Sequence, residues 1–148
     1  MTENILDNYE EIEYKRGECD KYANEIIFDK CKIYYKNRLK HRDNDLPAYE
    51  DEHGTKIWYK NGLLHRDTID INGNDLPAIE YSYGTKEWYK NGKRHRENDL
   101  PAIEYCSGVK EWYRGGKRHR DNDLPAIENS DGDKEWYKNG IRYYLKCK

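Results

Sequence analysis

One sequence unit recurs along this chain, and its spacing is the strongest constraint on the fold. Successive tryptophans are 30, 24 and 24 residues apart, prolines follow the same intervals, and four of the five histidines, all except His53, are 24, 30 and 24 residues apart. A fixed period of this length is typical of arrays in which each unit packs only on its neighbours. We expect a structural core made of one Trp, one His and one Pro per unit: Trp58, Trp88, Trp112, Trp136, His41, His65, His95, His119, Pro47, Pro77, Pro101 and Pro125.

The single irregular interval has a simple origin. Where other units read HRENDLP or HRDNDLP, one reads HRDTIDINGNDLP, with six extra residues around Thr68 to Gly73. Surface loops tolerate changes of length better than core elements do. The insertion therefore predicts an exposed loop at that place.

The unit from Asp75 to Arg96 predicts strands joined by tight turns. Proline lacks an N–H, so Leu-Pro-Ala suits a corner or a strand start. Ala78–Tyr81 and Lys86–Lys90 alternate as strands do, and no segment has sustained helical spacing of apolar residues. Asn91-Gly92 separates Lys86–Lys90 from the short strand Lys93–Arg96. This dipeptide is a strong hairpin signal, because a type I′ turn needs positive φ at both central residues.

The turns also predict which residues face one another. With Asn91-Gly92 as the centre of one turn, Tyr89 faces Arg94 and Trp88 faces His95. If the other turn is also centred on two residues, Tyr83 and Gly84, then Ile79 faces Trp88 and Glu80 faces Glu87.

The same register assigns residues to two faces. One face is the core, with Ile79, Trp88 and His95 in a row. The other is open and holds Ala78, Tyr89 and Arg94, with Arg96 placed to offset repulsion between Glu80 and Glu87. Because Tyr and Arg are enriched at interfaces, the open face is the candidate interaction face, formed by Tyr89, Tyr113, Tyr137, Arg94 and Arg118.

Composition agrees with a thin core. Ile, Leu, Val and Phe make up only 23 of 148 residues, whereas the chain has 15 Tyr and 4 Trp. Large aromatic side chains bury enough area to replace missing aliphatic residues. The net charge of −2 disfavours nucleic acid as a partner. The four cysteines form no CxxC pair and are expected to be reduced thiols.

We therefore predict an all-β fold, an elongated antiparallel sheet or β-solenoid of stacked hairpin repeats. Residues 1–31 are expected to form a divergent cap, with one degenerate repeat as an alternative. Residues 32–144 form the array and 145–148 a tail, all within one structural domain. Atypical end units are expected where stacked repeats must be capped.

The residues favour no catalytic site, metal site or cofactor. Equivalent strands of successive units would lie too far apart for neighbouring histidines to share one metal ion. The Glu80–Glu87 pair recurs in later units and is better explained as a charge lattice than as a general acid and base. No motif for phosphate binding or nucleophilic catalysis is present.

The repeat resembles the MORN (membrane occupation and recognition nexus) repeat in its run of Trp-Tyr, Asn-Gly and His. The form DNDLPAIEY…KEWYKNGKRHR is more similar to MORN-like proteins of giant DNA viruses, and the likeness covers Lys32 to Tyr144. It departs from the MORN consensus after His, where Arg-Asp-Asn-Asp or Arg-Glu-Asn-Asp replaces Gly-x-Gly. The resemblance implies stacked hairpins, a virus-encoded origin, and assembly, scaffolding or membrane-adjacent roles without shared catalytic residues.

The function expected is that of a non-enzymatic module for protein–protein interaction or assembly. Each basic KNGKRHR run is followed by an acidic run, so basic and acidic stripes are expected side by side. The partner is a protein or a second copy in a homodimer; the alternative is an anionic membrane surface. The N-terminal segment has no apolar run of a secretory signal, which favours the cytoplasm, of a host cell or a virion if the protein is viral.

Overall fold

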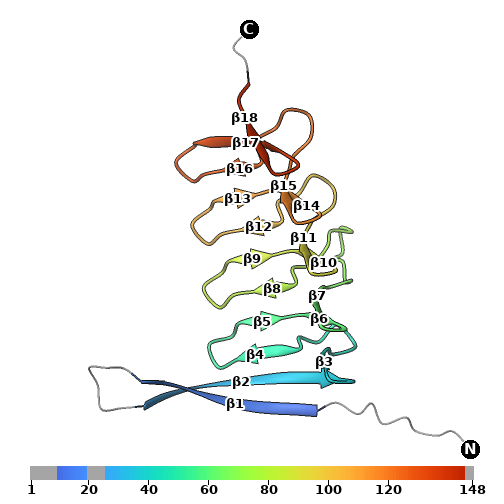
Figure 1. Cartoon of the computed structure of the whole chain (residues 1–148), viewed down its shortest axis with the longest axis vertical. Coiled ribbons are helices and arrows are strands. Elements are labelled where there is room, and N and C mark those ends of the chain that lie inside the picture. The colour runs from blue at the N-terminus through green and yellow to red at the C-terminus, as the bar shows by residue number, and fades with distance from the viewer. Residues whose placement is uncertain (1–9, 20–25, 146–148) are drawn as a thin grey trace, which may run out of the picture.

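A computed structural model describes residues 10–19 and 26–145, and every regular element in these ranges is a β-strand. A twelve-stranded sheet runs the length of the molecule, with β1 (Glu10–Cys19) at one end and β17 (Lys134–Lys138) and β18 (Ile141–Tyr143) at the other (Figure 1). Short two-stranded hairpins stack along one side of this sheet. The predicted all-β class and the elongated antiparallel array are confirmed.

Each unit contributes two strands to the long sheet and one hairpin beside it. In spatial order the sheet contains β1 (Glu10–Cys19), β2 (Ile26–Lys36), β4 (Tyr49–Asp51), β5 (Lys56–Ile57), β8 (Ile79–Glu80), β9 (Lys86–Glu87), β12 (Ile103–Glu104), β13 (Lys110–Glu111), β16 (Ile127–Glu128), β17 (Lys134–Lys138) and β18 (Ile141–Tyr143). The hairpins use β3 (Leu39–Lys40), which pairs with β2, then β6 (Tyr59–Lys60) with β7 (Leu63–Leu64), β10 (Tyr89–Lys90) with β11 (Lys93–Arg94), and β14 (Tyr113–Arg114) with β15 (Lys117–Arg118).

The Asn-Gly turn sets the hairpin register as predicted. Tyr89 pairs with Arg94, and the turn residues Asn91 and Gly92 have φ angles of 51° and 76°. Gly92 also donates its N–H to the Leu64 carbonyl of the preceding hairpin at 2.9 Å. The hairpins are therefore fixed both by their own turns and by one backbone bond to their neighbour.

The second turn differs from its predicted register. Ile79 pairs with Glu87 and Glu80 with Lys86, so the predicted facing of Ile79 with Trp88 and of Glu80 with Glu87 is wrong. The loop holds three residues between Tyr81 and Thr85, because the Tyr81 N–H bonds the Thr85 carbonyl at 3.0 Å. Gly84, with a φ of 96°, closes this longer loop and shifts the pairing by one residue.

A β-bulge follows from this shift. The N–H of Ala78 bonds the Glu87 carbonyl at 2.9 Å although Ile79 is the residue paired with Glu87. In this bulge Ala78 and Ile79 both stand opposite Glu87. Two residues that follow each other in sequence can then both face inward, and Ala78 and Ile79 are both buried. The predicted position of Ala78 on an open face is therefore wrong.

The strand of each internal unit is interrupted at its tryptophan. The Trp88 N–H donates to the Ala102 carbonyl of the next unit at 2.8 Å, and the hairpin beyond it leaves the long sheet. The three internal tryptophans are buried, together with four alanines and with the isoleucine that follows three of them, whereas Trp136 of the predicted core is only half-buried. The core comprises Ala48, Trp58, Ala78, Ile79, Trp88, Ala102, Ile103, Trp112, Ala126 and Ile127.

A row of alternating charge crosses the whole sheet. In the observed register every glutamate of this row stands opposite lysines, where the predicted register placed glutamate against glutamate. Opposite charges in facing positions stabilise a sheet modestly. From β1 to β17 the row reads Glu13, Lys32, Glu50, Lys56, Glu80, Lys86, Glu104, Lys110, Glu128, Lys134.

The six-residue insertion forms the expected exposed loop. The Leu76 N–H bonds the Thr68 carbonyl, and the exposed Ile71 lies near the tip. The regular corner of the next unit is a tight turn instead, in which Asn98 and Asp99 have φ angles of 60° and 53°. The insertion therefore replaces a left-handed Asn-Asp turn with a small protrusion.

The expected domain boundary at residue 32 falls inside β2, and β1 pairs along its whole length with β2. Residues 1–9 and 20–25 of the expected cap and 146–148 of the expected tail lie outside the described residues. Within the described residues the structure contains no helix of the length and apolarity that a membrane span requires. The cytoplasmic location stays a prediction.

Deleting residues 68–73 should leave a folded chain and raise its free energy of unfolding by about 1 kcal/mol. The deletion restores HRDNDLP, which allows the Asn74-Asp75 turn and shortens the connection. Thermal and urea unfolding of both chains measure the change. A loss of β-sheet circular dichroism, or a lower midpoint, would show that the insertion supports the array.

Candidate functional site

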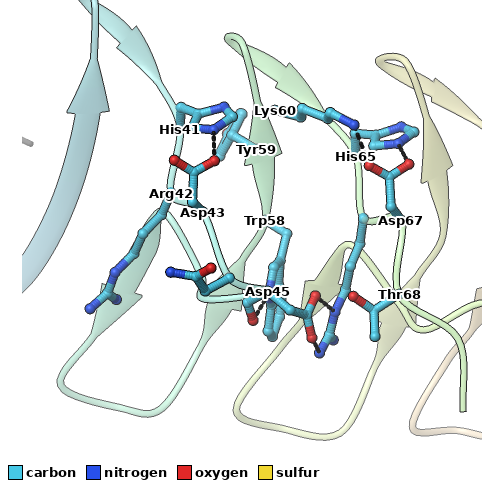
Figure 2. A pocket seen from close by; sticks show the side chains of 12 residues that line it. His41, Arg42, Asp43, Asp45, Trp58, Tyr59, Lys60, His65, Asp67 and Thr68 are labelled. Atoms are coloured by element: carbon cyan, nitrogen blue, oxygen red, sulfur yellow. Dashed lines mark hydrogen bonds and ion pairs between the residues drawn. The ribbon is translucent and has the colours of Figure 1, made fainter. Parts of the chain in front are cut away.

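The junction between neighbouring units is where the repeated polar residues converge. Figure 2 shows the junction of the first two hairpins, a hollow of about 190 Å³ whose lining includes His41, Asp45, Trp58, His65 and Arg66. Hollows of about 180 and 190 Å³ recur at the following two junctions. Their recurrence with the repeat indicates an architectural role.

One arginine holds each junction. The Arg66 guanidinium lies over the Trp58 ring, 3.8 Å from its centroid. It donates to the Pro77 carbonyl at 3.2 Å and to Glu80 at 3.1 Å, both in the next unit. It also forms a two-bond pair with Asp45 at 2.8 and 2.7 Å (Figure 2). A planar guanidinium suits this combination of stacking and bidentate bonding, which a lysine could not reproduce.

The same arrangement recurs along the array. Arg96 lies 3.7 Å from the Trp88 centroid and binds Glu104 at 2.7 Å. Its predicted role beside Glu80 and Glu87 is therefore wrong, since its partner belongs to the next unit. The other members are Arg42 over Tyr34 and Arg120 over Trp112.

Each tryptophan is also held by its own corner. The Nε1–H of Trp58 donates to the Asp45 carbonyl at 3.0 Å, which satisfies the indole where its ring is buried. Equivalent bonds of Trp88, Trp112 and Trp136 reach Asp75, Asp99 and Asp123. The prolines of the predicted core supply the carbonyls that the arginines bind.

The histidines connect successive hairpins. Nδ1 of His65 accepts the Asn91 N–H of the next turn at 3.0 Å, and Nε2 bonds Asp67. Because a backbone N–H can only donate, Nδ1 carries no proton and Nε2 donates to the carboxylate. His41, His95 and His119 accept from Asn61, Gly115 and Asn139 in the same way. All four histidines of the predicted core therefore bond a backbone N–H of the next turn.

The unit that follows the insertion is the least regular. His95 has Glu97 where the other histidines have aspartate, and its Nε2 lies 3.1 Å from the Glu97 carboxylate without the geometry of a hydrogen bond. Nε of Arg96 is buried without a hydrogen-bond partner, whereas Arg66 and Arg120 bind Asp45 and Asp99 through Nε. Both defects lie beside the protruding loop that replaces the tight corner.

A buried carboxylate organises the predicted interaction face. Glu87 is 7% exposed and accepts hydrogen bonds from Tyr89 at 2.8 Å and from Arg94 at 3.0 Å. The next unit repeats this cluster with Glu111, Tyr113 and Arg118, and Tyr137 bonds Glu135. The polar ends of the candidate interaction residues are therefore bound within the array, and their binding of a partner stays a prediction.

Burial and charge shift the pKa values of this cluster. Burial raises the pKa of Tyr89 to about 12, with a further contribution from its bond to Glu87. Burial and the charge of Glu111 raise the pKa of Tyr105 to about 12. Burial by itself would lower the pKa of Arg94, but the Glu87 carboxylate raises it, so the guanidinium stays charged.

The burial of Glu87 and Glu111 was missed from the sequence, although the chain contains a signal for it. The equivalent position holds Ile57 in an earlier unit, where the Arg94 position holds Leu64. An apolar pair in one unit thus replaces a Glu–Arg pair in another. Exchange of this kind indicates an inward-facing position.

The basic and acidic runs pair with each other. Lys36, Lys60, Lys90 and Arg114 each bind the acidic residue seven positions later: Asp43, Asp67, Glu97 and Asp121. Hydrogen bonds from Arg114 and His119 lower the pKa of Asp121 to about 2. Much of the charge in the expected stripes is therefore used within each hairpin.

The candidate site has no organised set of metal ligands among the described residues. The four repeat histidines occur one per junction, each bonded to a backbone N–H. No family model, curated protein or solved structure matches the chain. The function therefore has to be inferred from the geometry of the array.

Replacing His119 with alanine should lower the free energy of unfolding by about 1–3 kcal/mol, because the Asn139 N–H and Asp121 lose their shared partner. His53→Ala, in an exposed turn, is the matched control and should change stability by less than about 0.5 kcal/mol. Urea unfolding followed by circular dichroism measures both. Equal effects of the two substitutions would contradict the bridging role.

The raised tyrosine pKa values predict loss of stability in alkali. The folded pKa values of Tyr89 and Tyr105 exceed the ordinary value of 10, so their contribution is complete below about pH 10 and is lost as pH rises toward 12. Tyrosinate absorbance should show a class that ionises late, and Glu87→Gln should bring Tyr89 closer to the ordinary value. Glu104→Gln is the control: Glu104 binds Arg96 and not Tyr89, so this substitution should leave the pKa of Tyr89 unchanged. Ionisation of all tyrosines as one class near pH 10 would contradict the buried cluster.

Proposed function

We propose that this chain is a non-enzymatic module for protein–protein interaction or assembly. The observation that carries the proposal is that, among residues 10–19 and 26–145, the long sheet is open and ends at β1 and at the Lys134–Glu135 segment of β17 (Figure 1). Edge strands present backbone groups to which another chain can pair. Strand addition at such an edge is a common mode of protein recognition.

The surface of the array supports a protein partner. Ile141 is 74% exposed and lies in β18, which pairs with β17 next to the open segment. Exposed apolar side chains beside an open edge favour contact with protein. The ion pairs across the hairpins leave less positive charge for anionic headgroups, so a membrane surface is the weaker candidate. The suggested viral origin rests on the repeat resemblance alone.

A proline at Lys134 tests the edge. The Trp112 N–H points to the next unit. Backbone groups of alternate residues point to the same side of a strand, so those of Lys110 point to the next unit as well. Lys134 is the equivalent of Lys110 in the last unit, and its backbone groups therefore lie on the open edge. Lys134→Pro removes this N–H, whereas Lys134→Ala keeps it and is the matched control.

The three immobilised proteins should differ in the partners they retain from a cell extract. Wild type and Lys134→Ala should retain the same set of proteins. Lys134→Pro should bind that set at least about tenfold more weakly, which is a change of about 1.4 kcal/mol in binding free energy. Pelleting with anionic liposomes at low and high salt is measured in parallel. Two results would contradict the proposal. One is retention of proteins that is the same for Lys134→Pro and wild type. The other is that salt-sensitive pelleting with liposomes is the only binding detected.

A further inference from the structure

The two ends of the sheet carry sequences that complement each other. At the β17 end the open segment is Lys134-Glu135. Inside the array the same dipeptide, Lys110-Glu111, is covered by Ile127-Glu128 of the next unit, with Lys110 facing Glu128 and Glu111 facing Ile127. The internal junctions therefore show which kind of segment pairs with a Lys-Glu dipeptide, namely an extended Ile-Glu segment. Such a segment is the expected partner of Lys134-Glu135.

The opposite end carries such a segment. β1 contains Glu11-Ile12-Glu13-Tyr14, which matches Ala102-Ile103-Glu104-Tyr105 at three of four positions. Glu13 stands opposite Lys32 of β2, as Glu104 stands opposite Lys110 within its unit. β1 thus takes the place of a unit's first strand, and no strand of the described part of the chain pairs with its other side.

Building on the proposed function, we propose that its partner is a second copy of this chain, docked head to tail. Lys134 of one copy then faces Glu13 of the next, and Glu135 faces Ile12. The alternating row begins with Glu13 and ends with Lys134, so the junction continues the alternation across the boundary. The occupant of the open β17 edge is therefore the β1 edge of another molecule.

Docking of like ends is disfavoured. In antiparallel pairing about a two-fold axis, facing residues lie on the same sheet face, so a central residue meets itself. At the β17 edge this sets Lys134 against Lys134 or Glu135 against Glu135. At the β1 edge it sets Glu13 against Glu13, or Glu11 against Glu13 around a central Ile12. Each of these registers opposes like charges, which destabilise a sheet, whereas a β1 register centred on Tyr14 would set Glu13 against Lys15.

Head-to-tail docking leaves one free edge at each end of the assembly. Such a contact extends into a fibre unless its rotation closes a ring, and a dimer is its shortest form. The junction is weaker than an internal one, because Tyr143 and Tyr144 stand where other units have the bridging His and the stacked Arg. Assembly is therefore reversible and depends on protein concentration and on salt.

Charge reversal at the two ends provides the test. Sedimentation velocity at low salt should show wild-type oligomers that lengthen with concentration. Lys134→Glu and Glu13→Lys should each weaken association at least about tenfold, which is about 1.4 kcal/mol, by opposing like charges. An equimolar mixture of the two variants should associate again, because both of its junctions pair lysine with glutamate. Circular dichroism confirms that each variant is folded.

The outcomes separate this inference from the proposed function. Wild type that is monomeric at high concentration, a closed dimer that does not grow, or a mixture that stays monomeric would overturn head-to-tail docking. A monomer that still retains cellular proteins in a manner sensitive to Lys134→Pro would leave the proposed function standing. Absence of both self-association and such retention would remove both.

Discussion

The array depends on one arginine per unit whose guanidinium meets three neighbouring structures at once. It covers the Trp ring of its own unit, reaches the proline carbonyl and the sheet glutamate of the next unit, and in two units also pairs with the aspartate of the preceding corner. A desolvated arginine over a tryptophan contributes about 2 kcal/mol. Because these contacts cross the junction, no single unit could retain its core alone.

On the hairpin side, the histidine bridge likewise makes each unit depend on its neighbour. A neutral imidazole accepts a backbone N–H of the next turn while it donates to a carboxylate of its own unit. Sheet, core and hairpins are thereby coupled to the same neighbour, as expected of an array stabilised by nearest-neighbour contacts. The ends of the described sheet keep the backbone pairing groups of an internal junction, although the last unit lacks the bridging His and the stacked Arg. This is the physical basis for assigning assembly to the ends.

The outer and inner rows of the sheet show how polar residues can build a fold with few aliphatic side chains. On the outer row, lysine and glutamate alternate and neutralise each other across the strands. On the inner row, Glu87 and Glu111 are buried with hydrogen bonds to both oxygens: one tyrosine and one arginine donate to Oε2, and a second tyrosine, Tyr81 or Tyr105, donates to Oε1. Two apolar residues, Ile57 and Leu64, occupy the equivalent places in an earlier unit, so satisfied polar clusters and apolar contacts are exchangeable there.

The sequence by itself determined the period, the all-β class, the exposed insertion and the Asn-Gly hairpins, because each depends on residues close together in the chain. The turn at Gly84 was misjudged by one residue, since two- and three-residue loops both suit its sequence. That difference decided which residues face inward. Only the tertiary structure showed that arginine covers tryptophan, that histidine reaches the next turn and that lysine faces glutamate across the sheet. These contacts join different units, and a repeated sequence specifies the unit without specifying how its neighbour is placed.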